Sequence, residues 1–325
     1  MFKLFTRRTV LIAAGLALAG TAMADTFPSK PVKLIVPYPP GGPIDGVARG
    51  LADRLSKIWG QNVVVDNRAG ANEIIAGDFT AKAPADGYTI LLGTDPTFSG
   101  NPFLFKKMPF NPFTDLAPIT RVALVNMAFI VPGTTPVNTL KEFVALVKAN
   151  PGKYNYGSAG AGGPTHLPFD AFLRQENLQM THVAYKGIAP AALDILSGTV
   201  QAMIAGSSAA TPYVANGKMK VLAINGTKRA KALPNVPTLT EAGFPNTDMY
   251  FYLGLATAKG TPKAVIDQIA ADTRKALTDQ TFVEKSLDIF GFDPIGETPE
   301  QFAEFLKKDR AAAEKRIRDA DVKLD

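Results

Sequence analysis

Few side chains in this sequence could carry out covalent chemistry. It contains two histidines, His166 and His182, and no cysteine. Ser158 lies shortly before His166, but Tyr156 stands where a nucleophile elbow of the form Gly-x-Ser-x-Gly needs its first glycine. We therefore expect no catalytic serine–histidine pair and no hydrolase. His166 should instead fix its loop by hydrogen bonding, and His182 should have a local role in a strand.

Metal and cofactor chemistry also find little support. Two histidines without clustered carboxylates make a poor ligand set, and the lack of cysteine excludes thiolate sites. The glycine-rich segment 157–163 lacks the Lys-Ser/Thr of a P-loop and the spaced glycines of a dinucleotide-binding turn. We expect no metal, no cofactor and no enzymatic activity.

Glycine-rich segments are the more informative pattern. In open α/β sheets, ligands bind beyond the carboxyl ends of the strands, where loops lead into helix N-termini. Glycine lets backbone N–H groups approach a ligand, and a helix N-terminus carries about half a positive charge, so such loops suit a carboxylate. Tight turns are enough to explain the glycines of any single loop. Several such loops at equivalent strand ends together favour a ligand-binding cleft. The segments chosen by this rule are 38–45, 93–99, 157–166, 185–190 and 206–208.

The elements that must position these loops alternate between strand and helix, which predicts an α/β fold. Capping boxes at Thr139–Glu142 and Thr298–Gln301 mark two helix starts. The first unit comprises strands 32–36, 62–66 and 88–92 with helices 45–59 and 73–82. The second comprises strands 154–156, 180–184, 200–205 and 220–225, with helices ending near 150, 175 and 196. Strand 250–256 and helices 262–277 and 299–321 complete the chain.

This order predicts two lobes, each a mainly parallel sheet flanked by helices. The C-terminal part needs a sheet to cover, so we expect it to pack back on the first unit. Two strands near 122–131 and 246–255 would then cross between the lobes and form a hinge beneath a cleft. The expected division is 25–127 plus 248–325 for lobe 1 and 128–247 for lobe 2.

The N-terminus has the composition of a secretory signal. Basic residues precede a short apolar run, Val10–Ala19, and the small residues Ala22 and Ala24 define a cleavage site near Ala24. Both the general and the twin-arginine export routes fit this segment. Without residues 1–24 the chain has 32 basic and 29 acidic residues, a net charge of +3. This mild excess suits an acidic small ligand and not a nucleic acid.

A set of short motifs occurs in order along the whole mature chain. They are 35–42 with Asp45, Ala48 and Arg49; 60–61 and 65–71; 86–89; 101–102; 118–119; 160–162 with 166–167; 185–187 with 190–191; 217–218; 234–238; and 241–243. This ordered set resembles one family, the receptors of tripartite tricarboxylate transporters, often called Bug-type binding proteins.

The resemblance implies a Venus-flytrap protein, type II-like, that closes on a carboxylate and binds it largely through backbone groups. Carried over by position, it indicates Tyr38, Gly41, Gly42, Ile44 and Asp45 on one side, and Ser158, Gly160, Gly162, His166, Ile188, Ala189 and Pro190 on the other. The strand-end rule adds Thr94 and Phe98.

Three side chains in these loops have a structural alternative. Asp45 is placed to cap its helix and to pair with Arg49. This structural role explains an aspartate at this position as well as a ligand contact does. Tyr38 and Phe98 could flank an apolar or aromatic ligand body, or simply pack.

The sequence departs from the family pattern at three places. Gly163 stands where Thr is common, and the segment Ala205-Gly206-Ser207-Ser208 lacks the Asp that suits a ligand amine. Gly163, Ala205 and Ser207 are therefore included in the expected site. Asn72-Glu73 replaces more usual glycines, and nothing in the sequence assigns this pair a ligand role. We expect a nitrogen-free dicarboxylate, aliphatic or aromatic, terephthalate being worth testing.

The expected partners follow from the same resemblance. They are the small carboxylate and the inner-membrane permease subunits of a tripartite tricarboxylate-type transporter, with the protein a monomer in the periplasm. A sensor subunit that presents its liganded form to a signalling partner uses the same closed state, so that alternative stays open.

Overall fold

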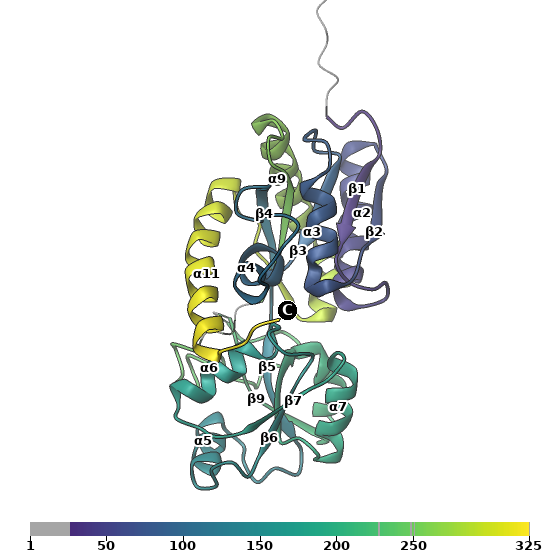
Figure 1. The fold of residues 1–325 in the computed structure, drawn as a ribbon. Coiled ribbons are helices and arrows are strands. Elements are labelled where there is room, and N and C mark those ends of the chain that lie inside the picture. The colour runs from purple at the N-terminus through teal and green to yellow at the C-terminus, as the bar shows by residue number, and fades with distance from the viewer. Residues whose placement is uncertain (1–26, 227, 248, 250, 325) are drawn as a thin grey trace, which may run out of the picture.

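The computed structural model describes residues 27–226, 228–247, 249 and 251–324. Its two β-sheets lie in two lobes, one above the other in Figure 1. The sheet of lobe 1 has the strand order β11-β4-β10-β3-β1-β2, and the sheet of lobe 2 has the order β7-β6-β8-β5-β9. The expected signal segment and its cleavage site fall outside the described residues.

Lobe 1 is built from both ends of the chain. β1 pairs in parallel with β2 and β3, whereas β10 runs antiparallel to β3 and β4, and β11 runs antiparallel to β4. Its strands are β1 (Val32–Val36), β2 (Val63–Asn67), β3 (Thr89–Gly93), β4 (Leu116–Val125), β10 (Tyr252–Ala258) and β11 (Phe292–Pro294). Its helices are α2 (Pro43–Trp59), α3 (Ile74–Ala81), α4 (Asn101–Leu104), α9 (Lys263–Leu277), α10 (Gln280–Ser286) and α11 (Pro299–Ala320). Single turns η1 (Ala71–Glu73), η2 (Pro96–Gly100) and η4 (Asp288–Phe290) link them.

Lobe 2 is the middle of the chain. β6 pairs in parallel with β7 and β8, and β5 runs antiparallel to β8 and β9. Its strands are β5 (Met127–Pro132), β6 (Asn155–Ser158), β7 (Thr181–Ala184), β8 (Ala202–Gly206) and β9 (Met219–Ile224). Its helices are α5 (Leu140–Lys148), α6 (Leu167–Gln175), α7 (Ile188–Ser197) and α8 (Thr211–Val214), with the turn η3 (Ser207–Ala209) after β8.

Local sequence rules explain where the main helices begin and end. α5 and α11 each begin with the expected capping box, in which Thr139 and Thr298 accept from the backbone N–H groups of Glu142 and Gln301. α2 begins with Pro43 at its first position and ends at Gly60, whose left-handed φ of 65° a glycine adopts at little cost. Its buried apolar stripe packs on the sheet of lobe 1.

The two lobes are joined where β4 passes into β5 through Asn126, and where the chain returns after β9 to begin β10. Asn225, which is 6% exposed, ties these crossing segments together. Its side-chain oxygen accepts from the N–H of Met127 at 2.7 Å, and its amide nitrogen donates to the carbonyls of Val125 at 3.0 Å and Met249 at 2.9 Å. A buried backbone group without a partner is costly, so this one side chain satisfies three groups where the sheets separate.

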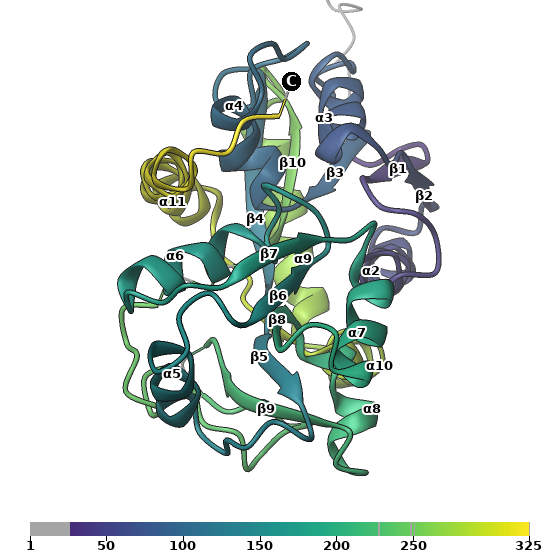
Figure 2. The same cartoon turned by 60° about the horizontal axis from the view of Figure 1, so that its bottom comes forward.

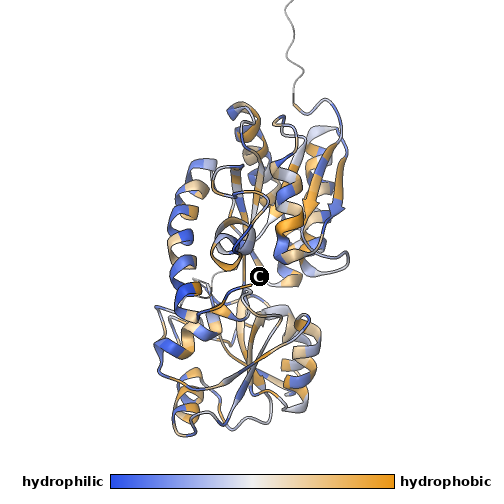
Figure 3. Ribbon diagram, in the orientation of Figure 1, coloured by the Kyte–Doolittle hydropathy of each residue, from blue (hydrophilic) through white to orange (hydrophobic). Residues whose placement is uncertain are grey.

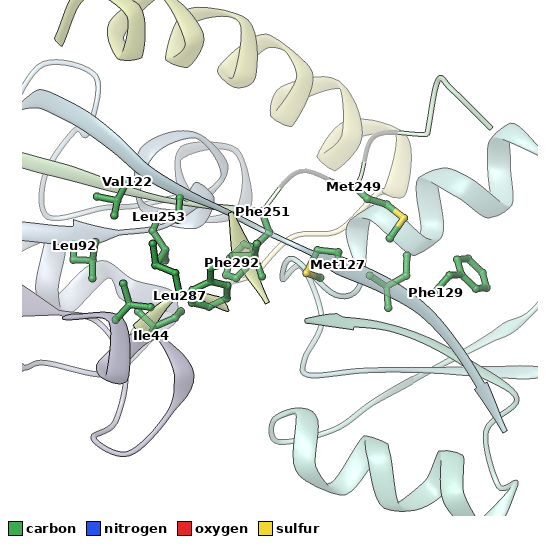
Figure 4. Close-up of a cluster of buried hydrophobic side chains, with 14 of the residues drawn as sticks. Ile44, Leu92, Val122, Met127, Phe129, Met249, Phe251, Leu253, Leu287 and Phe292 are labelled. Atoms are coloured by element: carbon green, nitrogen blue, oxygen red, sulfur yellow. The ribbon is translucent and has the colours of Figure 1, made fainter. Parts of the chain in front are cut away.

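One apolar cluster continues through the crossing. Figure 4 shows Ile44, Leu92 and Val122 of lobe 1 at one end, Phe129 of lobe 2 at the other, and Met127 and Met249 between them. In Figure 3, which colours residues by hydropathy, the strands are largely hydrophobic, whereas α11 is mostly hydrophilic. The two-lobed α/β fold expected from the sequence is confirmed, while the division at 127/128 and 247/248 stays a prediction. The expectation that each sheet is mainly parallel is wrong, because the strands β4, β10 and β11 in lobe 1 and β5 in lobe 2 pair antiparallel and make both sheets mixed.

No helix in the described ranges is both long enough and apolar enough to cross a membrane.

Replacing Asn225 with alanine should lower the free energy of unfolding by about 2–4 kcal/mol, because it leaves one buried N–H and two buried carbonyls without partners. Urea denaturation measures the change. Asn246→Ala, at an exposed position on the return segment, is the matched control and should stay within about 0.5 kcal/mol of the native chain. Equal stabilities of the two variants would show that Asn225 does not support the crossing.

Candidate ligand-binding site

The carboxyl ends of the parallel strands face each other across the junction of the lobes. A crevice at this junction is lined by η2 and α4 of lobe 1, by the glycine-rich loop and α6 of lobe 2, and by α11. Because η2 follows β3 and the glycine-rich loop follows β6, the two sheets present corresponding edges to one another. The lining residues are Asp95, Pro96, Gly100, Leu104, Gly162, Gly163, Pro164, Leu167, Pro168, Ala313, Arg316 and Ile317.

Two helix N-termini, one from each lobe, add unpaired backbone donors beside this junction. α2 begins after Gly42 and α7 begins after Gly187, and neither of these residues makes a side-chain capping hydrogen bond. Figures 1 and 2 both show α2 in lobe 1 and α7 in lobe 2 on the same side of the molecule. Ala189 is exposed, while Gly42 and Ile188 are half-buried. Gly41 and Pro190 are also exposed, but the Gly41 N–H donates to Asp45 and proline has no N–H. Exposed N–H groups at helix N-termini are the groups that bind carboxylates through the backbone.

Asp45 holds the first of these loops in place. Its carboxylate is 2% exposed and accepts from the Gly41 N–H at 2.9 Å, from Arg49 Nε at 2.8 Å and from Asn67 Nδ2 at 2.9 Å. Burial would raise its pKa, but the hydrogen bonds from Arg49, Gly41 and Asn67 together lower it below the ordinary value. The expectation that Asp45 caps α2 is wrong, because Gly42 is the N-cap and Asp45 reaches back to Gly41.

The glycine-rich loop of lobe 2 is tied by its own side chains. Ser158 Oγ lies 3.2 Å from the Gly160 N–H and 3.1 Å from the Gly160 carbonyl, and Thr165 Oγ1 accepts from the Ala159 N–H at 2.8 Å. His166 Nδ1 accepts from the Gly162 N–H at 3.0 Å. His166 therefore fixes the loop, as expected, and Gly160 and Gly162 take the left-handed φ values of 147° and 73°.

The two histidines stack on each other. Their ring centroids are 3.8 Å apart with an interplanar angle of 14°, and Tyr156 stacks on His182 at 4.9 Å. Burial, with a smaller contribution from the facing His182, lowers the pKa of His166 to about 4, and burial also lowers the pKa of His182. Both rings are neutral at pH 7, which lets His166 Nδ1 accept from Gly162.

A serine and a histidine do form a hydrogen bond, although not a catalytic pair. Ser158 Oγ lies 2.7 Å from His182 Nε2, a contact that joins β6 to β7. Ser158 is 0% exposed, so no substrate carbonyl can approach its oxygen. The hydrogen bond is therefore structural, and sequence reasoning missed it because strand pairing creates it.

The side chains of other expected site residues are buried in the core. Phe98 is 1% exposed and packs against Tyr252 and Phe302, so the prediction that its ring flanks a ligand is wrong. Ile44 and Ala205 are buried in the apolar clusters of lobes 1 and 2 and can offer only backbone groups.

The remaining expected residues lie at contacts between elements. Ser207 is buried where η3 meets η4, and its Oγ occupies the space beside Gly291. Gly162 packs against Leu104 and the C-terminal residues Val322 and Leu324, while Gly163 lines the crevice. Tyr38 is half-buried, and its hydroxyl lies near Thr94, which is buried.

Sequence reasoning missed the role of Glu73. Its carboxyl is buried at the strand ends of lobe 1 and accepts from the hydroxyls of Tyr38, Thr94 and Thr97. The only signal in the sequence was its position where glycine is usual.

Two facing α/β lobes with backbone donors at their adjoining edges define the class of two-lobed solute-binding proteins. The model of the tripartite tricarboxylate transporter family receptor matches residues 47–321, and the chain belongs to this family. The resemblance seen in the motifs is confirmed. The family consists of solute-binding receptors, so the protein is a receptor of the periplasmic binding class and not an enzyme.

Solved structures are similar over nearly the whole chain. The periplasmic binding protein BugD is 33% identical with a TM-score of 0.76 and covers 91% of this chain and 99% of its own. An R. palustris protein solved with adipate is 30% identical with a TM-score of 0.80, covering 91% and 99%. MatC from Rhodopseudomonas palustris, solved with bound malate, is 27% identical with a TM-score of 0.75, covering 90% and 100%.

Acid should destabilise the native chain through His166. The unfolded state takes up a proton near pH 6.5, whereas the folded state does so only near pH 4, so stability falls as pH drops through this window. Between pH 7.5 and 5 the loss from this group should be about 2 kcal/mol. In His166→Asn, whose side-chain oxygen can still accept from Gly162, the drop measured by urea denaturation should shrink by about that amount. An unchanged drop would assign the acid sensitivity to other groups.

Proposed function

We propose that this protein is a periplasmic receptor that closes its two lobes on a dicarboxylate and delivers it to the permease of a tripartite tricarboxylate-type transporter. Membership in the receptor family supports delivery to such a permease. An export signal at residues 1–24, read from the sequence, supports the periplasmic location.

The observation that carries the proposal is the pair of uncapped helix N-termini, α2 in lobe 1 and α7 in lobe 2, on either side of the lobe junction. Each end offers backbone N–H groups and a partial positive charge, so the two ends together match a ligand with a carboxylate at each end. The side chains of Asp45 and His166 are occupied in holding the loops and leave the recognition to the backbone.

Two further observations narrow the ligand. The relatives solved with adipate and malate bind aliphatic dicarboxylates. The segment Ala205–Ser208 holds no acid that could bind a ligand amine, which favours a ligand without nitrogen. Phe98 is buried, so only Tyr38 remains of the two rings expected to flank an aromatic ligand, and an aliphatic dicarboxylate is the better candidate.

A thermal-shift screen of residues 25–325, followed by calorimetry, tests the ligand class. Succinate, malate or adipate should raise the unfolding midpoint, because a ligand that binds only the native state stabilises it by mass action. Glutamate, benzoate and terephthalate are the comparison ligands. A shift from glutamate alone, or from none of these compounds, would contradict the proposal.

A pair of glycine substitutions tests the site itself. Gly41 and Gly60 both have left-handed φ values, 87° and 65°, and a Cβ at either position meets nothing within 4 Å. Gly41→Ala and Gly60→Ala should therefore cost similar stability, about 1 kcal/mol each. Gly41 precedes the N-terminus of α2 and Gly60 ends the same helix, so only Gly41→Ala should weaken dicarboxylate binding, by about tenfold. Equal affinities in calorimetry would place the ligand away from this loop.

A further inference from the structure

The turn η1 has an unusual backbone for its sequence. Ala71, Asn72 and Glu73 follow one another with left-handed φ values of 47°, 49° and 75°. Side chains disfavour this region, and three such residues in succession persist only where the surroundings hold them. Asn72 and Asn101 supply one restraint, since each donates a side-chain hydrogen bond to the other residue. Glu73 supplies the other.

The Glu73 carboxyl accepts four hydrogen bonds, all from neutral donors. Its Oε1 accepts from the Tyr38 hydroxyl at 2.5 Å and from the Thr94 hydroxyl. Its Oε2 accepts from the Thr94 N–H at 3.1 Å and from the Thr97 hydroxyl at 2.5 Å. Each carboxyl oxygen thus has two donors, and none of the donors is a cation. Proteins bind a carboxylate in this way when they use hydroxyl and backbone groups.

These donors come from the part of lobe 1 that faces lobe 2. Tyr38 follows β1, Thr94 follows β3, and Thr97 lies in η2, whose neighbouring residues Pro96 and Gly100 line the crevice against lobe 2. Glu73 is 4% exposed and enters this place from a separate segment. The chain thus places a carboxylate of its own where two strand ends of lobe 1 offer donors.

We propose that Tyr38, Thr94 and Thr97 form a carboxylate subsite that the chain fills with its own Glu73. The subsite follows from these contacts alone. Its effect on selectivity rests on the proposed function: because Glu73 occupies and covers these donors, a third ligand carboxylate has no free donor there, and any approach to the Glu73 carboxyl would bring two carboxylates together away from water. The receptor therefore discriminates dicarboxylates from tricarboxylates such as citrate.

The first experiment empties the subsite. Glu73→Gly removes the side chain and suits the left-handed φ of 75°. The four donors then lose the carboxylate, although the Tyr38 and Thr94 hydroxyls, 3.2 Å apart, can still bond to each other. Propionate has the shape of the missing side chain, so at about 100 mM it should raise the unfolding midpoint of this variant by several degrees relative to equal chloride. Propionamide, of the same shape without charge, should give much less. The native chain should respond equally to propionate and chloride.

Two matched variants control for the substitution. Asn72→Gly relieves the same backbone strain one residue earlier while keeping Glu73, and Glu73→Gln keeps the subsite filled; neither should respond to propionate. If Glu73→Gly does not fold alone, refolding with propionate should recover folded protein. Absence of any propionate effect on folding or midpoint overturns the subsite.

The second experiment measures selectivity by calorimetry. The native chain should bind its dicarboxylate and bind citrate at least tenfold more weakly, and Glu73→Gly should gain at least tenfold in citrate affinity. Equal affinity of the native chain for citrate overturns the selectivity. Failure of the subsite and failure of the proposed function give different results. If propionate stabilises Glu73→Gly but the native chain binds no dicarboxylate, the subsite is supported and the proposed function is refuted. If the native chain binds a dicarboxylate but propionate does not stabilise Glu73→Gly, the proposed function is supported and the subsite is refuted.

Discussion

The hydrogen bonds of Asn225 are the constraint on which the arrangement of the two lobes depends. Where β4 leaves one sheet and β5 enters the other, the ladder is interrupted and backbone groups lose their strand partners. Asn225 supplies partners to Met127, Val125 and Met249 at once, and the backbone of Asn126 bonds to Gly291 and Ser207. Because β5 continues directly from β4, fixing this junction also fixes which edges of the sheets face each other.

Given that arrangement, the facing loops can recognise an anion with few charged side chains. Asp45 and His166 each accept from a glycine N–H and so hold the loops in place. Recognition of this kind requires rigid loops, since a backbone donor has no rotamers with which to adjust. The stacked histidines and the Ser158–His182 hydrogen bond provide that rigidity in lobe 2. They resemble parts of a catalytic site, but their burial assigns them a structural role.

Glu73 shows how one residue can change a site without touching the loops that define it. A glycine at this position would avoid the left-handed strain but remove the acceptor that four donors share. Glu73 instead has the left-handed backbone conformation and accepts hydrogen bonds from those donors. Burial raises the pKa of Glu73 above its ordinary value, although the hydrogen bonds from Thr94, Thr97 and Tyr38 act in the opposite direction.

The sequence by itself determined the features that depend on neighbouring residues. The capping boxes at Thr139 and Thr298, the turn at Gly60 and the glycine-rich loops at strand ends could be read directly, and their order gave the α/β lobes and the receptor family. Only the tertiary structure decided which side chains are free. Phe98 is core because Tyr252 and Phe302 come from distant segments, Ser158 meets His182 only through strand pairing, and the donors around Glu73 lie 21 to 35 residues away from it. Burial and hydrogen-bond partnership across such separations arise when elements pack, so no local pattern can encode them.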